Sequence, residues 1–215
     1  MLAPERIAAL SPLARDPSLS FYATEATHYP VVRPDAEAVL RLHPDLVLAG
    51  VYGASGALSL LKDRVRIVTV EDPQTFPAIA ETIENLGRTL DEPARANAIV
   101  ARMTATLSAI PDNAHGTALL LEPRGWTAGP GTLASAVLDR AGWHNIGTGA
   151  QLDLETARAQ RPRLLLTETT PKTPSLATDW LSHPALATLP RRTIDGRALL
   201  CGLPQTAELA ASLAQ

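Results

Sequence analysis

Few residues of this chain have the types and spacing that catalysis or metal binding requires. Its five histidines show neither i, i+4 pairing nor the Cys/His spacing of a metal site: His28, His43, His115, His144 and His183. The segment "GASG", Gly53–Gly56, misses the G-x-S-x-G nucleophile elbow by one residue. A single cysteine, Cys201, excludes an internal disulfide and a cysteine-based metal cluster. The sequence therefore predicts no enzyme, no metal centre and no cofactor.

Aromatic and basic side chains in loops after apolar segments point instead to ligand binding. The candidates are Arg15, Tyr52, Arg124 and Trp126. Aromatic residues make up only 4% of the chain, so a tryptophan in a polar, glycine-flanked loop is notable. Flat rings suit a bulky ring-shaped ligand, and arginine suits an anionic one. Alternatively, Trp126 covers the local core and Arg15 pairs with Asp16.

Short, unbroken apolar runs are the main structural signal. They are typical of strands buried on both faces of a parallel sheet. The runs are "RIAAL", "LVLAG", "VRIVTV", "TALLLE", "RLLLTE" and "RALLC". The last run makes Cys201 a small buried residue by default. Helical spacing separates the runs, for example over Thr132–Arg140, where Gly142 is placed to end the helix.

One element is written twice. "DAEAVLRLHPDLVL" from Asp35 and "DLETARAQRPRLLL" from Asp153 share five of fourteen positions, at a constant offset of 118 residues. Each copy predicts a helix with an Asp cap, a proline stop and a buried strand. This is half of a βαβ crossover, and its repetition indicates two similar lobes.

The middle of the chain differs, because it has helical stripes and no strand signal. One stripe is Ile79, Ile83, Leu86 and Leu90; a second, after Pro93, is Ile99, Met103, Leu107 and Ile110. We therefore predict an α/β fold with two Rossmann-like lobes of mainly parallel sheet, joined by a long rigid helix. The predicted domains are an N-terminal lobe over 1–90, a linker helix over 91–111 and a C-terminal lobe over 112–215. A cleft between lobes is a favoured place for a ligand.

Composition limits the partners. The chain has 215 residues, 46% of them hydrophobic and 19% charged, which is enough for two small domains with a core. Its net charge of −3, without a basic run, argues against nucleic acid. No apolar run approaches the roughly 20 residues that span a bilayer, so direct membrane insertion is not expected.

The order of these motifs resembles the periplasmic substrate-binding proteins of ABC importers for iron-siderophores and cobalamin. The first copy of the repeat looks like that family's "NLE-ALKPDLVL" element. "TALLLEPRGWTAGPGTLASAVLDRAGWHNIG", Thr117–Gly147, resembles its strand, cleft loop, Gly-x-Gly-Thr turn and helix ending near "AG-x-x-N". The resemblance covers most of the chain. It implies capture of a ferric siderophore or a cobalamin-like ligand in the cleft, with no bond made or broken.

The resemblance also implies a docking role for the repeat. In the family, a glutamate at this place on each lobe faces arginines of the membrane permease, so Glu37 and Glu155 are expected to dock onto an ABC permease dimer. The structural alternative is that each acid stabilises the start of its helix, where a carboxylate gains about 0.3–1 kcal/mol.

The chain departs from the family pattern near its start. Only "RIAALSPLARDPSLS" precedes "PVVRPDAEAVL", so one βα unit of the first lobe is expected to be missing. No signal peptide is recognisable in "MLAPERIAAL". The expected location is nevertheless the periplasm, with this chain a shortened form of an exported protein.

Two other functions remain open at this point. One is a cytoplasmic α/β enzyme that binds a phosphorylated small molecule at "GPGT", Gly129–Thr132, although this turn lacks the lysine of a P-loop. The other is a heme or corrinoid chaperone that works without a transporter.

Overall fold

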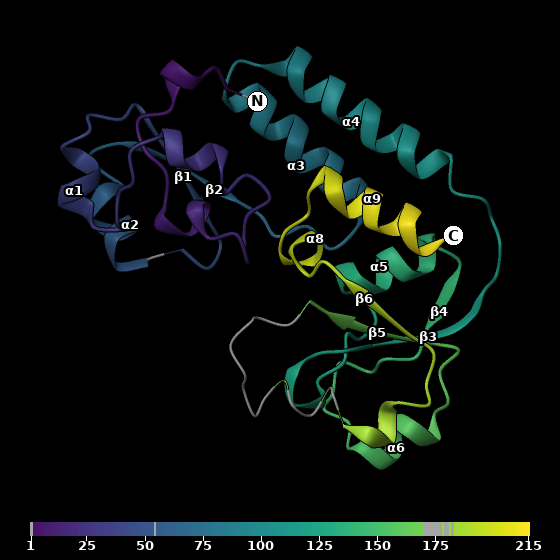
Figure 1. Cartoon of the computed structure of the whole chain (residues 1–215). Helices are drawn as coiled ribbons and strands as arrows, with labels where there is room; N and C mark the ends of the chain where they lie inside the picture. The colour runs from purple at the N-terminus through teal and green to yellow at the C-terminus, as the bar shows by residue number, and fades with distance from the viewer. Residues whose placement is uncertain (1, 54, 170–177, 179–180, 182) are drawn as a thin grey trace. The chain divides into compact units, whose positions relative to one another are not determined.

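The computed structural model describes residues 2–53, 55–169, 178, 181 and 183–215. The chain divides into two compact units, and each is discontinuous in sequence. Unit 1 comprises Met1–Asp72 and Thr82–Ala96, and unit 2 comprises Pro73–Glu81 and Asn97–Gln215. Both units alternate helices with parallel strands, so the predicted α/β class with parallel sheets is confirmed (Figure 1).

Unit 1 is built around a single βαβ element. Strands β1 and β2 pair in parallel, with Leu46 opposite Arg66 and Gly50 opposite Val70. Three short 3-10 helices precede them. The elements are η1 Pro4–Arg6, η2 Pro12–Arg15, η3 Glu25–His28, α1 Ala36–Leu40, β1 Leu46–Gly50, α2 Ser55–Leu61 and β2 Arg66–Val70.

The strand predicted for "RIAAL" is wrong. Only Leu10 makes a β-bridge, in parallel to Val31. Prolines explain the loss: Pro4 begins η1, whose first turn is closed by a hydrogen bond from Ile7 N to Pro4 O, and Pro12 begins η2. A proline cannot donate to a sheet ladder and favours the first turn of a helix.

Two helices lead from one unit into the other. They are α3, Phe76–Thr89, and α4, Pro93–Ser108. At the turn between them Gly87 lies so close to Ala96 that a Cβ on the glycine would be 2.3 Å from the alanine Cβ. The beginning of α3 belongs to unit 2. There Ile79 is fully buried and packs beneath Gly202, where a Cβ would lie 2.5 Å from the isoleucine side chain.

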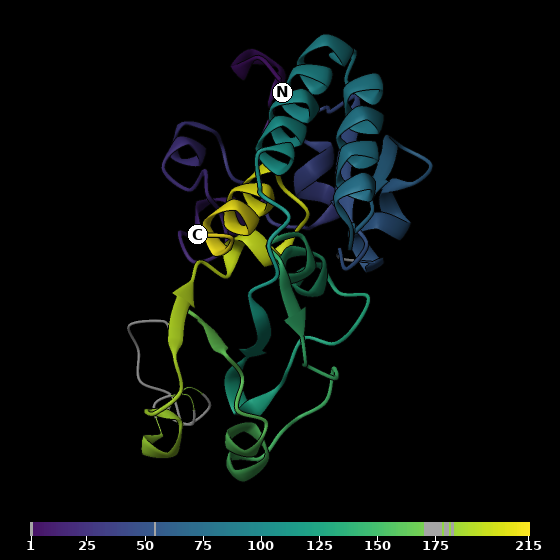
Figure 2. The same cartoon turned by 90° about the vertical axis from the view of Figure 1, so that its right-hand side faces the viewer.

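Unit 2 contains a four-stranded parallel sheet in the order β4-β3-β5-β6. Figure 2 shows these strands alongside one another, with α9 drawn in yellow. The elements are β3 Gly116–Leu121, η4 Pro123–Gly125, α5 Leu133–Arg140, β4 Trp143–Asn145, α6 Leu154–Ala159, β5 Leu164–Glu168, η6 Pro184–Leu186, β6 Arg191–Ile194, α8 Arg197–Leu200 and α9 Pro204–Leu213.

Alternating residues of β3 and β5 face opposite layers. Leu119, Leu121 and Leu165 pack with Ala157 of α6 and Leu186 of η6. Helix α5 contacts β4 and α9. Leucine-rich central strands are therefore buried, as the unbroken apolar runs predicted.

The run "RALLC" does not form a strand. It is helix α8, and Cys201 after it is exposed rather than buried. Asp195 precedes the helix, and its carboxylate accepts a hydrogen bond from Arg197 N at 3.1 Å, which favours a turn at this point over a strand. The strand that pairs with β5 at the edge of the sheet is β6, which precedes this run. Its sequence "RRTI" is polar because an edge strand is exposed to solvent.

The repeated element has the same backbone in both copies. Asp35 and Asp153 cap α1 and α6, with side chains that accept hydrogen bonds from Ala38 N at 2.9 Å and Thr156 N at 2.6 Å. At the other end the residues before the two prolines, His43 and Arg161, both have positive φ, 49° and 42°. The similarity predicted from sequence thus extends to an uncommon backbone conformation.

Candidate functional site

Three acidic residues follow neighbouring strands of unit 2. Glu122 comes directly after β3, Glu168 is the last residue of β5, and Asp195 comes directly after β6. Because these strands are parallel, their carboxyl ends meet at one edge of the sheet, which is where ligands bind in open α/β sheets.

A pocket of about 480 Å³ lies at this edge. Glu122 and Glu168 contribute to its wall, as does the N-terminus of α5. The other lining residues are small, apolar or uncharged, and no Lys, Arg or His of the described residues lines it. They are Gln74, Pro123, Thr127, Ala128, Gly129, Thr132, Leu133, Ala134, Gly149, Leu199 and Leu200.

The carboxylates of this edge differ in their partners. Asp195 forms an ion pair with Arg197, with 2.6 Å between Oδ2 and Nη2, and hydrogen bonds from Arg197 lower its pKa. Glu122 and Glu168 have no such pair among the described residues. Burial raises the pKa of Glu122. Burial, and then the charges of Glu122 and Asp195, raise the pKa of Glu168.

The loop after β3 is held in place by the loop after β4. Asn145 joins them: its Nδ2 donates to Ala128 O at 3.0 Å, and its Oδ1 accepts from Gly147 N at 2.9 Å. The backbones also touch, since a Cβ on Gly129 would lie 2.7 Å from Gly149 N. We call the segments 127–129 and 145–150 the loop clasp. It gives the pocket a preformed wall.

The turn "GPGT" has a structural role in the clasp. Thr132 caps α5, accepting from Ser135 N at 3.3 Å and donating to Gly129 O at 2.8 Å. The next amide, Leu133 N, donates to Gln74 Oε1 at 2.9 Å. With this amide occupied and two carboxylates in the same pocket, the turn does not offer the cradle that a phosphate needs.

Comparison with known proteins identifies the chain. A family model described as "Periplasmic binding protein" matches residues 6–190. This chain belongs to the periplasmic binding protein family. The predicted family is thus confirmed, and its members are solute-binding proteins rather than enzymes.

Known proteins are similar to this periplasmic binding protein in sequence or in structure. A cobalamin-binding protein of Halobacterium salinarum is 29% identical over 148 residues, which cover 62% of this chain. The match spans 40% of that relative's length. The periplasmic heme-binding protein HutB of Vibrio cholerae has a TM-score of 0.74 at 20% identity, covering 98% of this chain and 91% of its own. The catecholate-siderophore binding protein VctP of Vibrio cholerae has a TM-score of 0.73 at 16% identity, covering 96% and 85%. At these identities the two structures show a shared fold.

The four ligand-binding residues predicted from the sequence lie in both units of this periplasmic binding protein. Arg124 and Trp126 share the turn after β3, where Glu122 N donates to Trp126 O at 2.8 Å. Arg124 has a left-handed backbone, with φ of 62°, and Trp126 is 47% exposed. Neither side chain lines the pocket, although Pro123 and Thr127, which flank the two residues, do.

The other two predicted residues belong to unit 1. Tyr52 is 89% exposed in the turn after β1. Arg15 donates from its guanidinium to three backbone carbonyls, those of Ala26, Thr27 and Tyr29. These bonds connect the end of η2 to η3 and to the residue that follows η3. They favour a structural role for Arg15, though not the pairing with Asp16, whose carboxylate accepts from Ser18 instead.

Glu37 and Glu155 are both exposed in the first turns of α1 and α6. They are 118 positions apart, on the two copies of the repeat, and belong to different units.

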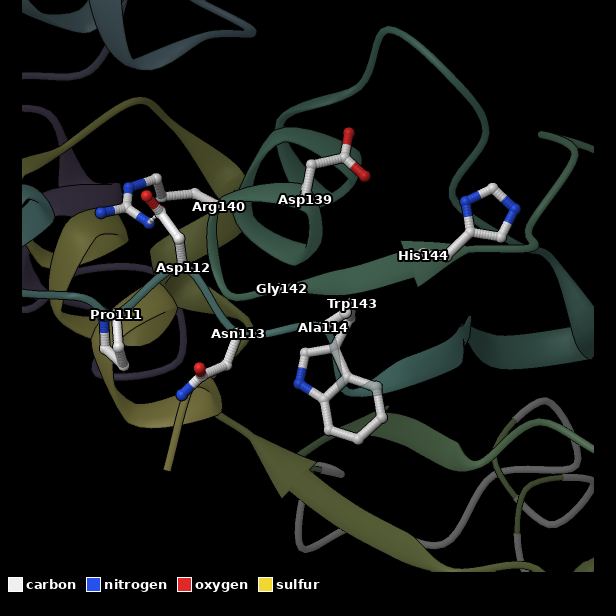
Figure 3. Close-up of a pocket in the computed structure, with 9 residues that line it drawn as sticks. All are labelled: Pro111, Asp112, Asn113, Ala114, Asp139, Arg140, Gly142, Trp143 and His144. Carbon is white, nitrogen blue, oxygen red and sulfur yellow. Dashed lines mark ion pairs between the residues drawn. The ribbon is translucent and has the colours of Figure 1, made fainter.

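A second cavity, also of about 480 Å³, lies beside the start of β4. Two of its polar side chains donate hydrogen bonds to backbone carbonyls at the ends of helices. Arg140 donates to Leu107 O and Ile110 O at the end of α4, and Figure 3 shows its guanidinium beside the carboxylate of Asp112, 3.7 Å away. Trp143 Nε1 donates to Leu213 O at the end of α9, at 2.9 Å. This cavity is explained by helix capping and is not a candidate ligand site.

Two further observations limit other functions. No group of three or more His, Cys, Asp or Glu side chains in the described part of the chain is arranged to hold a metal ion. No described helix is both long and apolar enough to cross a membrane.

The prediction from sequence missed Glu168 and Asn145, and it did not single out Glu122 in the loop after the predicted strand. A signal for the two acids was present, because the apolar runs "TALLLE" and "RLLLTE" both end in glutamate. Asn145 was visible in the "AG-x-x-N" pattern, but its partners lie in a loop that only the fold brings near.

Proposed function

We propose that this protein is the ligand-capturing component of an ABC import system and works in the periplasm. It binds a ferric siderophore or a corrinoid and delivers it to a permease dimer. The observation that carries the proposal is the preformed pocket at the carboxyl ends of the strands, in a chain of a solute-binding family. The names of the relatives, which bind cobalamin, heme or a catecholate siderophore, support this class of ligand.

The residues proposed to contact the ligand beyond the pocket are Trp126, Arg124 and Tyr52. Trp126 and Arg124 lie on the turn whose neighbours line the pocket, and both side chains are exposed. Tyr52 presents a large aromatic surface from unit 1. An aromatic ring on a corrin, a heme or a catecholate offers stacking that is worth about 0.5–1.5 kcal/mol beyond its buried area. Arg15, the fourth residue predicted from the sequence, is the weakest candidate, because its guanidinium already donates to three backbone carbonyls.

A binding titration tests the ligand role. Purified protein is titrated with cobalamin, ferric siderophores and heme by calorimetry and tryptophan fluorescence. We expect saturable binding of at least one of them, weakened by Trp126→Ala and much less by Trp126→Phe, which keeps a flat ring. Equal affinity in Trp126→Ala would remove this residue from the site, and no binding of any of these ligands would refute the proposed function.

The proposed docking role of Glu37 and Glu155 has its own test. Both side chains are exposed at helix starts on the two copies of the repeat. Exposed ion pairs contribute about 0.2–1 kcal/mol each, so each alanine variant has a small effect and the double variant a larger one. The measurement is uptake into vesicles that contain the permease and its ATPase. Glu208→Ala, an exposed acid on α9, is the matched control. Weaker ligand binding by the isolated double variant would contradict a docking role.

A further inference from the structure

We propose that Glu122 and Glu168 select the ligand by charge. The pocket takes a ligand that presents N–H or O–H donors or a positive charge, and it rejects one that presents carboxylates or other anionic groups. The inference rests on the proposed function, because it names the chemical class of the ligand for the same pocket.

The charges around the pocket carry the argument. Of the three acids at this sheet edge, Asp195 is ion-paired with Arg197, which donates to it through Nε at 2.9 Å and Nη2 at 2.6 Å. Glu122 and Glu168 line the pocket, and none of its described lining residues is basic. The wall therefore has two formal negative charges without a counter-ion from the described residues.

The carboxylate of Glu168 has no ion pair among the described residues and packs closely against the chain after β6. It lies against the backbone of Gly196, where a Cβ would be 2.6 Å from Glu168 Cδ. Glycine at this position allows the carboxylate to remain at the pocket. Burial raises the pKa of Glu168 and of Glu122, as expected of carboxylates whose charge lacks compensation. A bound donor or cation would supply that compensation, and a bound anion would add to the repulsion.

The rest of the wall limits the shape of the ligand. Leu199, Leu200 and Pro123 give the pocket apolar surface. The ligand is thus amphipathic: it has an apolar body, and amide, hydroxyl or ammonium groups on its edge. Corrinoids with side-chain amides fit this description, as do ferric hydroxamates with an amine. Heme with its propionates and ferric catecholates, which are anionic, do not fit.

Four probes distinguish these classes. Cyanocobalamin is neutral and rich in amides, ferrioxamine B is cationic, and hemin and ferric enterobactin are anionic. Calorimetric titration of the full chain should show tighter binding of the first two than of the anionic pair. If only cyanocobalamin binds, its amides are the recognised groups; if ferrioxamine B also binds, positive charge is sufficient. Both results support selection by charge.

Variants assign the effect to the two residues. Glu122→Gln and Glu168→Gln keep the shape of the side chain and remove the charge. Each should weaken the best donor or cationic probe about fivefold, in the range of a solvent-screened charge interaction of about 1 kcal/mol, and strengthen an anionic probe. Glu208→Gln, outside the pocket, should change neither. Thermal unfolding of each variant checks that it is folded.

The outcomes separate this inference from the proposed function. Tightest binding of an anionic probe, or glutamine variants with unchanged preferences, would overturn selection by charge and leave ligand capture standing. If no probe binds to the folded protein, the proposed function fails, and this inference fails with it.

Discussion

The substitution Asn145→Ala tests whether the loop clasp holds the wall of the pocket. It removes the hydrogen bonds to Ala128 O and from Gly147 N. Each bond contributes about 1 kcal/mol net, and a buried carbonyl left without a donor adds a penalty of its own. Ala128 and Gly147 are both buried, so water does not easily replace the lost partner. We expect the free energy of unfolding to fall by about 2–3 kcal/mol.

The assay is urea denaturation followed by circular dichroism, with ligand affinity as a second measurement. For a protein of this size the expected loss corresponds to a lower Tm, by about 4–12 °C. The affinity for the best ligand should also fall, because the loop would have to be ordered on binding. His144→Ala is the control, since His144 is the exposed neighbour on β4. An Asn145→Ala variant as stable as His144→Ala would show that the side chain does not hold the two loops together.

Three other measurements follow from the structure. Arg140→Ala should cost about 2 kcal/mol of unfolding free energy, because two carbonyls at the end of α4 lose a charged donor; denaturation should show Arg140→Lys to be intermediate. Glu168→Gln should be more stable than the parent at neutral pH. Its raised pKa means that the parent gains stability as the pH falls through the folded-state value, so the gap should close in acid; a gap that widens in acid would contradict this. Hydrogen exchange should be faster in the sheet of unit 1 than in that of unit 2. Leu48 and Leu60 of unit 1 are exposed, and the central strands of unit 2 are buried; equal protection would refute the comparison.

The repeated element could be predicted because its signals are local. An Asp cap, helical spacing and a proline stop lie within fourteen residues, and both copies fold accordingly. The strand predicted for "RALLC" is wrong because that prediction also used only local signals. A short apolar run fits a buried strand or a buried helix equally well. The turn before α8, in which Asp195 accepts a hydrogen bond from Arg197 N, favours the helix.

The candidate site was only partly predictable. Residue types alone suggested Trp126 and Arg124, and both lie on the turn after β3. The pocket acids were missed because a glutamate after one strand says nothing until the strands are ordered. The order β3-β5-β6 places Glu122 beside Glu168, and that order depends on contacts between residues far apart in sequence.

The discontinuity of unit 2 determines how the protein can be divided into fragments. A fragment that begins at Asn97 would lack Pro73–Glu81, and with it Ile79 beneath Gly202 and the Gln74 side chain that accepts from Leu133 N. It would expose apolar surface and lose one wall residue of the pocket. A fragment that begins at Pro73 keeps all of these, together with both helices. For segmental isotope labelling, or for grafting the pocket onto another lobe, the natural junction therefore lies before α3 rather than within α4.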